Sequence, residues 1–296
     1  MNLERIIVGI QGLGIAETAY QNAVAYAKER KQGKANNSKN NEADLIIKHA
    51  DIRRSLMNMK SLIEGQRSLA FWVSQQIDVS LNHSDQKIKE NANELVSLMT
   101  PLIKSFFTDI GMEITNDAIQ VFGGYGYTKD QGIEQLFRDN RITPIYEGTN
   151  SIQAIDLVYR KILNNKIFDK YISQITDEVK DYTNNKNLEL FVQKFQKYIE
   201  LLNNFTSWLS EKNKNSKDDV SSACNDYLKV LGYISLAHSW LKILKVSYEK
   251  IDNNKAFFED KINTAKYYFD KILPRAQSHY LSAITGSDTI MKSNFN

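Results

Sequence analysis

Apolar residues recur every three or four positions through most of this sequence, the spacing that places side chains on one face of an α-helix. This spacing predicts helices over residues 3–29, over about 44–80, from Ser84 as N-cap to Phe122, and from about Thr149. The face of the first helix is formed by Ile6, Ile10, Leu13, Ala16, Tyr20, Val24 and Tyr26. No stretch alternates with a period of two for long enough to form a sheet, so we expect an all-α fold.

Particular positions in these helices carry further expectations. Pro101 should either start a new helix at Thr100 or kink a single long one. Small residues in the first helix should allow close approach of a neighbouring helix, namely Gly9, Gly12, Gly14 and Ala16. In the helix that begins near Thr149 we expect four side chains to face inward, namely Ile152, Ile155, Val158 and Ile162.

Polar segments divide the chain into two helical parts. Residues 33–44 contain no apolar anchor and should form a mobile loop, and the character of the pattern changes after residues 164–166. Beyond that point an apolar stripe in steps of four and three includes Phe191, Phe195, Tyr198, Leu202, Phe205 and Leu209. We therefore predict an up-and-down four-helix bundle over residues 1–163, with a second helical domain, residues 164–296, packed on it.

Composition narrows the class of protein. With 296 residues, of which 42% are hydrophobic, the chain can bury one sizeable core or two small ones. The 38 basic and 35 acidic side chains are scattered, which gives no focused positive field, so we expect no nucleic-acid partner. Gln11 and several glycines interrupt the first apolar run, which fits neither a signal peptide nor a transmembrane span. The single cysteine, Cys224, excludes a disulfide framework within one chain and favours a cytoplasmic location.

Several candidate motifs have a structural explanation. The four histidines are widely spaced and lack metal-ligand spacing with cysteine or carboxylate residues, so no metal site is predicted. We expect His238 to be a core histidine with a polar partner, and Cys224 to be a buried, inert thiol. The glycines of "GIQGLG" (9–14) follow no predicted strand, and Glu17 stands where a third glycine would be, so a dinucleotide fingerprint is rejected.

Two stretches carry more chemistry. In "QVFGGYGYT" (120–128), Gly123 is explained by a helix stop, whereas the further glycines and tyrosines are equally consistent with a ligand-facing turn. In "RDNRITPIYEGTN" (138–150), Glu147 stands between a tyrosine and a glycine, just before a helix. A carboxylate there can be held by the helix dipole alone, or can act as a general base if a cleft and a substrate are supplied.

Four motifs in this order resemble the C-terminal helical domain of the acyl-CoA dehydrogenases. They are "ER" (4–5), "YAKERKQG" (26–33), "QVFGGYGY" (120–127) and "RDNRITPIYEGTNSIQ" (138–153), and the resemblance covers residues 1–163. The tail "FFEDKINTAKYYFDKILPRAQSHYLSAITGSDTIM" resembles the extra C-terminal helical domain of a longer branch of that family, which includes methylthiopropanoyl-CoA dehydrogenases.

The resemblance implies an FAD enzyme and assigns roles to individual residues. Glu147 would remove the α-proton of an acyl-CoA while the flavin takes a hydride from the β-carbon, which yields a trans-2-enoyl-CoA. Arg5 would lie near the acyl-CoA and the carboxylate, and Tyr146 and Gly148 would flank the thioester. Flavin contacts are implied for Arg30 at the diphosphate, Gln120 and Gly124 at the adenosine of a neighbouring subunit's flavin, Gln32, and Thr149.

The family enzyme also has an N-terminal helical domain and a middle β-domain, which help to hold flavin and substrate. The resemblance therefore implies a homo-oligomer, a possible separate chain that supplies those domains, and electron-transfer flavoprotein as acceptor. We expect this chain alone to bind flavin poorly and to have little activity. The alternative is a non-catalytic helical domain, or the remnant of a split gene, that binds another protein through the surface the β-domain would cover.

Overall fold

The computed structural model describes residues 2–36, 38–39, 41–164, 167–183 and 185–295. Within these ranges the secondary structure is helical, and the only β-type pairing is an isolated antiparallel bridge between Lys31 and Leu45. The predicted all-α class is confirmed. Residues 37 and 40 of the predicted mobile loop, and 165–166 at the predicted change of character, lie outside the described residues.

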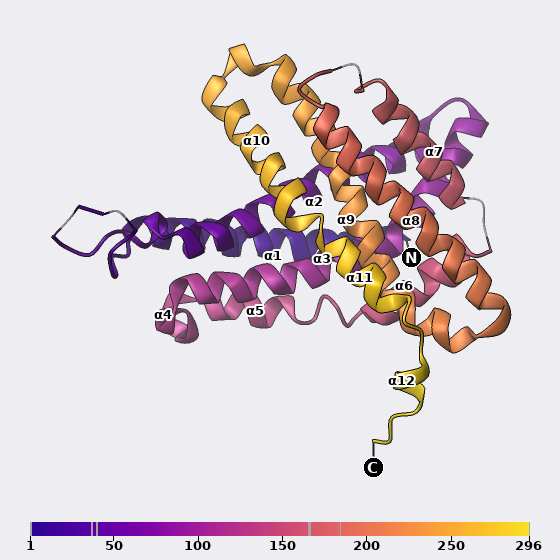
Figure 1. Cartoon of the computed structure of the whole chain (residues 1–296), viewed down its shortest axis with the longest axis horizontal. Coiled ribbons are helices and arrows are strands. Elements are labelled where there is room, and N and C mark those ends of the chain that lie inside the picture. The colour runs from indigo at the N-terminus through magenta and orange to yellow at the C-terminus, as the bar shows by residue number, and fades with distance from the viewer. Residues whose placement is uncertain (1, 37, 40, 165–166, 184, 296) are drawn as a thin grey trace.

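The first part of the chain is a bundle built around one buried helix, α3. In chain order its elements are α1 (Asn2–Glu29), the 3-10 turn η1 (Ile46–Lys48), α2 (Ala50–Asn82), α3 (Gln86–Phe122), α4 (Gly124–Tyr127), η2 (Lys129–Gln131), α5 (Ile133–Asn140), α6 (Asn150–Asp156) and the π-helical turn η3 (Leu157–Ile162). α1, α2, α5 and α6 all pack on α3, and α1, α2, α3 and α5 alternate in direction along the arm at the left of Figure 1.

Small residues bring α1 against α3. A Cβ added to Gly9 would lie 2.7 Å from the carbonyl oxygen of Ile103, and one added to Gly12 would lie 3.2 Å from the Cα of Thr108. Ala16 is fully buried in the same interface, so the predicted close approach is confirmed at these three positions. It is wrong for Gly14, which has no heavy atom within 4 Å of an added Cβ.

Two helix starts differ from the prediction. α2 begins at Ala50 rather than near residue 44, because the buried Asp44 accepts hydrogen bonds from the Ala35 amide and the Lys48 ammonium instead of entering a helix. The N-cap of α3 is Asp85 rather than Ser84, since the Asp85 carboxylate accepts from the first free amides of the helix. α3 is continuous through the buried Pro101, so the alternative of a fresh helix at Thr100 is wrong.

The second part of the chain packs on the first around another buried helix, α9. Its elements are α7 (Ile167–Lys180), α8 (Glu189–Asn215), α9 (Lys217–Glu249), η4 (Ile251–Asn253), α10 (Lys255–Tyr267), the π-helical turn η5 (Tyr268–Ile272), α11 (Arg275–Ala283) and α12 (Asp288–Met291). The predicted stripe of α8 is buried throughout, as expected for helix pairing. Trp240 of α9 links the two parts, since its indole nitrogen donates to the Ser61 carbonyl of α2 at 3.1 Å. The boundary near residue 163 stays a prediction.

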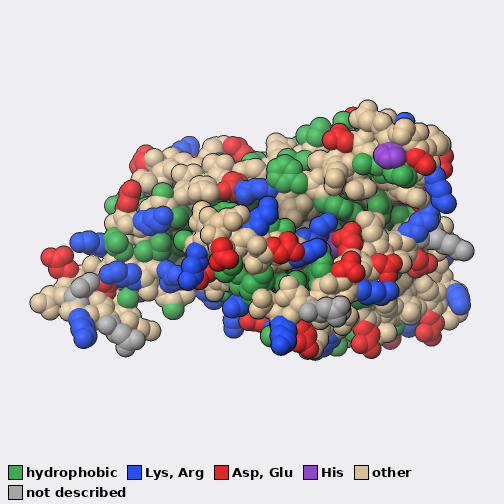
Figure 2. Space-filling view, turned by 90° about the horizontal axis from the view of Figure 1, so that it is seen from above, with side chains coloured by type: hydrophobic (Ala, Val, Ile, Leu, Met, Phe, Trp, Pro, Cys, Tyr) green, Lys and Arg blue, Asp and Glu red, His purple; other side chains and the backbone are tan. Residues whose placement is uncertain are grey.

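The surface charge and the apolar core helix concern two earlier expectations, that the charges are scattered and that the chain has no transmembrane span. The face seen in Figure 2 mixes basic and acidic side chains, without one dominant sign. Among the described residues, α3 is the one helix long and apolar enough to cross a membrane, but 83% of its most apolar stretch is buried inside the protein. That composition is explained by its place at the centre of the bundle.

Candidate functional site

Glu147 lies in an exposed turn whose backbone is unusual. Its φ is +58°, the only positive value outside glycine among the described residues, and Gly148 follows at φ +88°. The left-handed region costs a side-chain-bearing residue about 1–2 kcal/mol, so neighbouring contacts must hold this conformation. The Gln153 amide does so in part by donating to the Glu147 carbonyl at 3.1 Å.

The Glu147 carboxylate is free to meet a ligand. No hydrogen bond or ion pair engages it within the described part of the chain. Beside it, the exposed Tyr146 donates its hydroxyl hydrogen to the side-chain carbonyl of Gln11 on α1, which joins the turn to the first helix. Thr149 occupies the N-cap position of α6 as expected for its type, but its side chain makes no capping bond.

A buried polar network lies behind this turn. Asn150 donates its side-chain amide to the Asp109 carboxylate at 2.7 Å and to the Thr108 hydroxyl at 2.9 Å. Its side-chain oxygen accepts from the Lys104 ammonium, also at 2.9 Å. The Asn150 backbone amide donates to the Pro144 carbonyl at 3.0 Å and closes the turn. The turn is therefore fixed to α3 through one asparagine.

The charges around the network are mainly positive. Lys104 is fully buried, and burial lowers its pKa to about 8, with the Asp109 and Glu147 carboxylates opposing that shift and Arg5 adding to it. Burial also lowers the pKa of Lys161, which donates to the Ser97 hydroxyl at 2.5 Å. The Nε atom of Arg5 is buried without a hydrogen-bond partner in the described structure. Arg5 and Glu147 thus both act on Lys104, and Arg5 has unused donor capacity.

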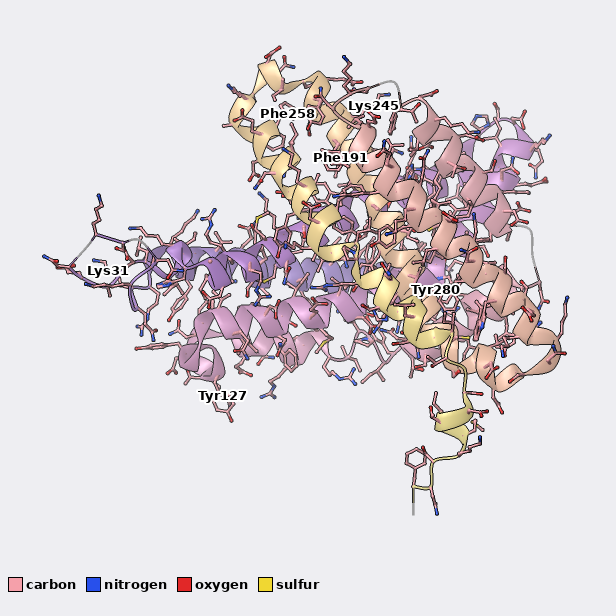
Figure 3. The ribbon with its side chains drawn as sticks, in the orientation of Figure 1. Lys31, Tyr127, Phe191, Lys245, Phe258 and Tyr280 are labelled. Carbon is pink, nitrogen blue, oxygen red and sulfur yellow. The ribbon has the colours of Figure 1, made fainter. Side chains whose placement is uncertain are left out.

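The residues expected to contact flavin diphosphate and adenosine lie at the other end of the bundle. Arg30 follows the last residue of α1, and its guanidinium lies 5.3 Å from the centre of the Tyr125 ring of α4. Gln120 is exposed on the last turn of α3, and an added Cβ at Gly124 would have open space around it. Figure 3 shows this end, with Lys31 and Tyr127 labelled and Tyr127 directed outward.

The end of the bundle that carries Arg30 and Gly124 has a guanidinium that is free in the described structure and an open backbone, and both are compatible with an anionic dinucleotide. Within the described ranges no carboxylate pairs with Arg30, so its planar fork of donors remains available for a diphosphate. Gly123, with φ +63°, and Gly124 leave the backbone open to close approach. The Gln32 side chain is exposed, while its carbonyl accepts from His49 at 2.9 Å.

The structure brings the predicted residues together in two groups rather than one. Arg5 lies near the start of α1, the helix to which Tyr146 joins the turn of residues 146–149 before α6, whereas Arg30, Gln32, Gln120 and Gly124 lie at the far end of α1 and α3. At a rise of about 1.5 Å per residue, the helix separates Arg5 from Arg30 by about 37 Å. One chain therefore carries the candidate residues on two separate surfaces.

The short helix after the turn corrects one expectation. Ile152 and Ile155 are 54% and 38% exposed, so the prediction that they face inward is wrong, while Val158 and Ile162 are buried as predicted. The buried face of α6 and η3 instead uses Asn150, Gln153, Ala154 and Leu157, because the polar Asn150 and Gln153 turn inward to bond α3 and the Glu147 turn. Exposed isoleucines consequently adjoin the Glu147 turn.

Other candidates in the chain have structural roles. His238 is buried and pairs with Glu178 at 2.9 Å, as predicted for a core histidine. Cys224 is 1% exposed, and burial raises its pKa to about 12, which agrees with an inert thiol.

A groove of about 470 Å³ between α2, α9 and α10 lies away from Glu147. The carboxylate that lines this groove, Glu64, is paired with Lys261 at 2.7 Å.

Sequence reasoning missed the residues that hold the turn. Lys104 interrupts the apolar run "PLIKSFF" on the most buried helix, and a lone lysine in such a run is the one signal that could have identified it. Asn150 and Gln153 were part of the quoted motif, but their bonds to distant or strained backbone are not visible in a linear pattern.

Comparisons with known proteins match both helical parts of the chain to known families. Residues 1–163 match the family model described as "Acyl-CoA dehydrogenase, C-terminal domain", and residues 172–294 match "Acetyl-CoA dehydrogenase C-terminal like". A 3-methylmercaptopropionyl-CoA dehydrogenase of Ruegeria pomeroyi is 40% identical over 163 residues, which are 55% of this chain and 28% of that protein. A butyryl-CoA dehydrogenase of Syntrophomonas wolfei is 28% identical over 286 residues, which are 93% of this chain and 46% of that protein.

Solved structures share the fold of both parts. Caenorhabditis elegans ACDH-11, crystallised in complex with C11-CoA, superposes with a TM-score of 0.75 at 18% identity, over 100% of this chain and 47% of that one. An acyl-CoA dehydrogenase from Bacillus anthracis complexed with FAD gives 0.75 at 17% identity, over 99% and 49%. The chain thus spans about half the length of these proteins or less. Since the first family model covers more than half of its 296 residues, the chain belongs to the acyl-CoA dehydrogenase family, in whose C-terminal region its matches lie.

Proposed function

We propose that this chain is the base-carrying part of an FAD-dependent acyl-CoA dehydrogenase, with Glu147 as the base. The observation that carries the proposal is the strained Glu147 turn in a chain of this family, whose carboxylate has no partner among the described residues. Strained backbone of this kind persists where the surrounding structure fixes it, and it is concentrated at functional sites.

The roles of the residues follow from their positions. A Glu147 oxygen would take the proton from the α-carbon of the acyl-CoA, while Arg5, with its partnerless Nε, would face the acyl-CoA beside the carboxylate. Tyr146 and Gly148 would flank the thioester. The Thr149 hydroxyl, which makes no capping bond to α6, would contact the flavin. FAD, when bound, supplies the oxidant that accepts a hydride from the β-carbon.

The second group of residues supports a homo-oligomeric site. Arg30, Gln32, Gln120 and Gly124 would hold the diphosphate and adenosine of a flavin whose reactive ring lies at a neighbouring subunit's Glu147. The distance of about 37 Å along α1 supports this arrangement, because it puts the two groups at different sites. By resemblance, we propose electron-transfer flavoprotein as the acceptor.

Exposed apolar side chains suggest how the site is completed. They lie on α1 and around the turn, which Tyr146 ties to α1: Leu3, Ile7, Ile10, Ile142, Ile145, Ile152 and Ile155. An apolar surface beside a candidate base is suited to burial under further protein, and excluding water strengthens the electrostatic interactions inside such a site. We therefore propose that the flavin site is complete only when N-terminal and β-domains, from this or a separate chain, cover this surface.

The proposal is tested by a flavin titration and an activity assay. Purified chain, alone and mixed with a chain that supplies the N-terminal and β-domains, is titrated with FAD by absorbance, and acyl-CoA is then added. We expect tight flavin binding, and bleaching by acyl-CoA, only in the mixture and not with the unmixed chain. Glu147→Gln should bind flavin normally but reduce bleaching by about 10²–10⁴-fold.

The controls separate loss of catalysis from loss of the fold. Lys271→Gln, a surface change on η5, should leave bleaching unchanged. Bleaching at the normal rate in Glu147→Gln would remove Glu147 from the mechanism. Absence of flavin binding in every mixture, with another protein bound to the apolar surface, would favour the non-catalytic interaction domain instead.

A further inference from the structure

Lys104 has surroundings that a structural lysine rarely has. It lies on α3 with no exposed surface, and among the described residues its one hydrogen bond is to the side-chain oxygen of Asn150 at 2.9 Å. Lysine is almost never fully buried unless it is paired, because removing an ammonium group from water is costly. No carboxylate lies within ion-pair distance of it in the described structure.

Asn150 connects that ammonium to the Glu147 turn. Its backbone amide closes the turn on the Pro144 carbonyl, and its side-chain amide is held by Asp109 and Thr108. With its side-chain oxygen taken by Lys104, the asparagine has a single orientation, which fixes where the turn begins and ends. Glu147, between these two points, is held in its left-handed conformation.

The charged groups that face Lys104 come from three elements. Asp109 shares α3 with it, Arg5 approaches from α1, and Glu147 approaches from the turn. Burial lowers the pKa of Lys104 to about 8, so the ammonium form predominates at neutral pH. The Asp109 and Glu147 carboxylates stabilise the ammonium form.

We propose that Lys104 is a positioning residue for Glu147 and that it fixes the turn through Asn150. The inference rests on the proposed function, since it explains how the base is oriented. Lys161 provides a matched control, because burial lowers its pKa too and Arg5 adds to that shift, but it donates to Ser97 and not to Asn150.

The first experiment uses the chain alone and does not depend on activity. Hydrogen exchange of residues 144–153 is compared by mass spectrometry in wild type, Lys104→Met, Asn150→Ala and Lys161→Met. We expect exchange in this segment to be about tenfold faster or more in the first two variants, with α9 unaffected, and unchanged in Lys161→Met. Unchanged protection in folded Lys104→Met, or equal loosening in Lys161→Met, would overturn the positioning role.

The second experiment tests the orientation of Glu147 in the flavin-loaded mixture with the N-terminal domains. Lys104→Met and Asn150→Ala should both lower kcat about tenfold or more with little change in KM, because the turn no longer orients Glu147 toward the substrate. Lys161→Met should leave kcat and KM unchanged.

The possible outcomes are distinct. If Lys104→Met keeps the wild-type kcat although exchange of the turn is faster, Lys104 does not position Glu147 for catalysis and the proposal is wrong. If wild type is inactive in every mixture, the proposed function fails, and the exchange result on the chain alone still decides whether Lys104 fixes the turn. If Lys104→Met does not fold, Asn150→Ala decides the positioning role by exchange, and normal protection in it overturns the proposal.

Discussion

Glu147 combines two properties that stability alone does not favour. Its backbone is left-handed, a conformation that glycine would adopt with less strain, and its exposed carboxylate has no partner among the residues that the structure describes. The bonds from Gln153 and Asn150 hold the turn in place at this strain. A residue kept in an unfavourable geometry by several others is expected where its side chain must point in a defined direction.

Lys104 should make stability depend on pH. Its folded pKa, about 8, lies below the unfolded value near 10.5, so between these pH values the unfolded chain binds more protons than the folded one. The free energy of unfolding should therefore rise with pH across this window, by up to about 1.4 kcal/mol per unit from this group. The measurement is urea unfolding at pH 7–10 for wild type and Lys104→Met.

The comparison of the two proteins isolates the lysine from other titrating groups. Buried tyrosines such as Tyr171, whose pKa burial raises, act equally in both and lower stability only above about pH 10. The difference in unfolding free energy between wild type and variant should grow in favour of wild type above pH 8. A constant difference would show that Lys104 keeps an ordinary pKa.

At the residue scale, sequence proposed candidate residues but not the contacts that hold them. Glu147, Arg5 and Arg30 became candidates because they lie in motifs whose residue types are recognisable in order. The strain at Glu147 is a backbone property, and the bond from Lys104 to Asn150 joins positions 46 residues apart. Periodicity reports which face of a helix is buried, and it contains no information on such pairs.

At the element scale, the contact between α1 and α3 depends on individual glycines. Gly9→Ala would place a methyl group 2.6 Å from the Ile103 side chain and 2.7 Å from its carbonyl oxygen, so the helices must separate. We expect this variant to lose about 1–3 kcal/mol of stability, despite the better helix propensity of alanine. Denaturant unfolding measures the change.

Gly14→Ala on the same helix is the matched control. An added methyl group there meets no atom within 4 Å, so only helix propensity acts and stability should rise by up to about 1 kcal/mol. Opposite signs for the two substitutions would support the packing argument. Equal stabilisation by both would mean that α1 does not approach α3 as closely as described.

Helix existence was predictable from sequence, whereas several boundaries were not. The burial pattern of α8 and α9 followed from spacing because apolar residues there have no competing role. The start of α2 was misplaced because Asp44 bonds to a residue of the preceding loop, and α6 was misread because its inward face carries the polar Asn150 and Gln153. Local pattern fails where tertiary bonds bury polar side chains.

At the scale of the whole molecule, the two parts are joined by contacts distant in sequence. Lys261 pairs with Glu64 at 2.7 Å, Arg275 pairs with Glu113 at 2.6 Å, and Trp240 bonds to Ser61. Sequence predicted a second helical layer but not these pairs, since each joins residues more than 160 positions apart. The packing gives α3 and α9 their positions as the two buried axes of the fold.

The separation of Arg5 from Arg30 along α1 has a genetic consequence. If each flavin is held by the Arg30 end of one subunit and served by Glu147 of another, a dimer that contains one Glu147→Gln chain and one Arg30→Ala chain has both defects in one site and none in the other. Two variants that are inactive alone should then complement each other, with about a quarter of all sites intact after random mixing. Recovery of flavin bleaching on co-expression, completed with the N-terminal domains, measures it. Failure of complementation between two well-folded variants would place both ends of the helix in the same site.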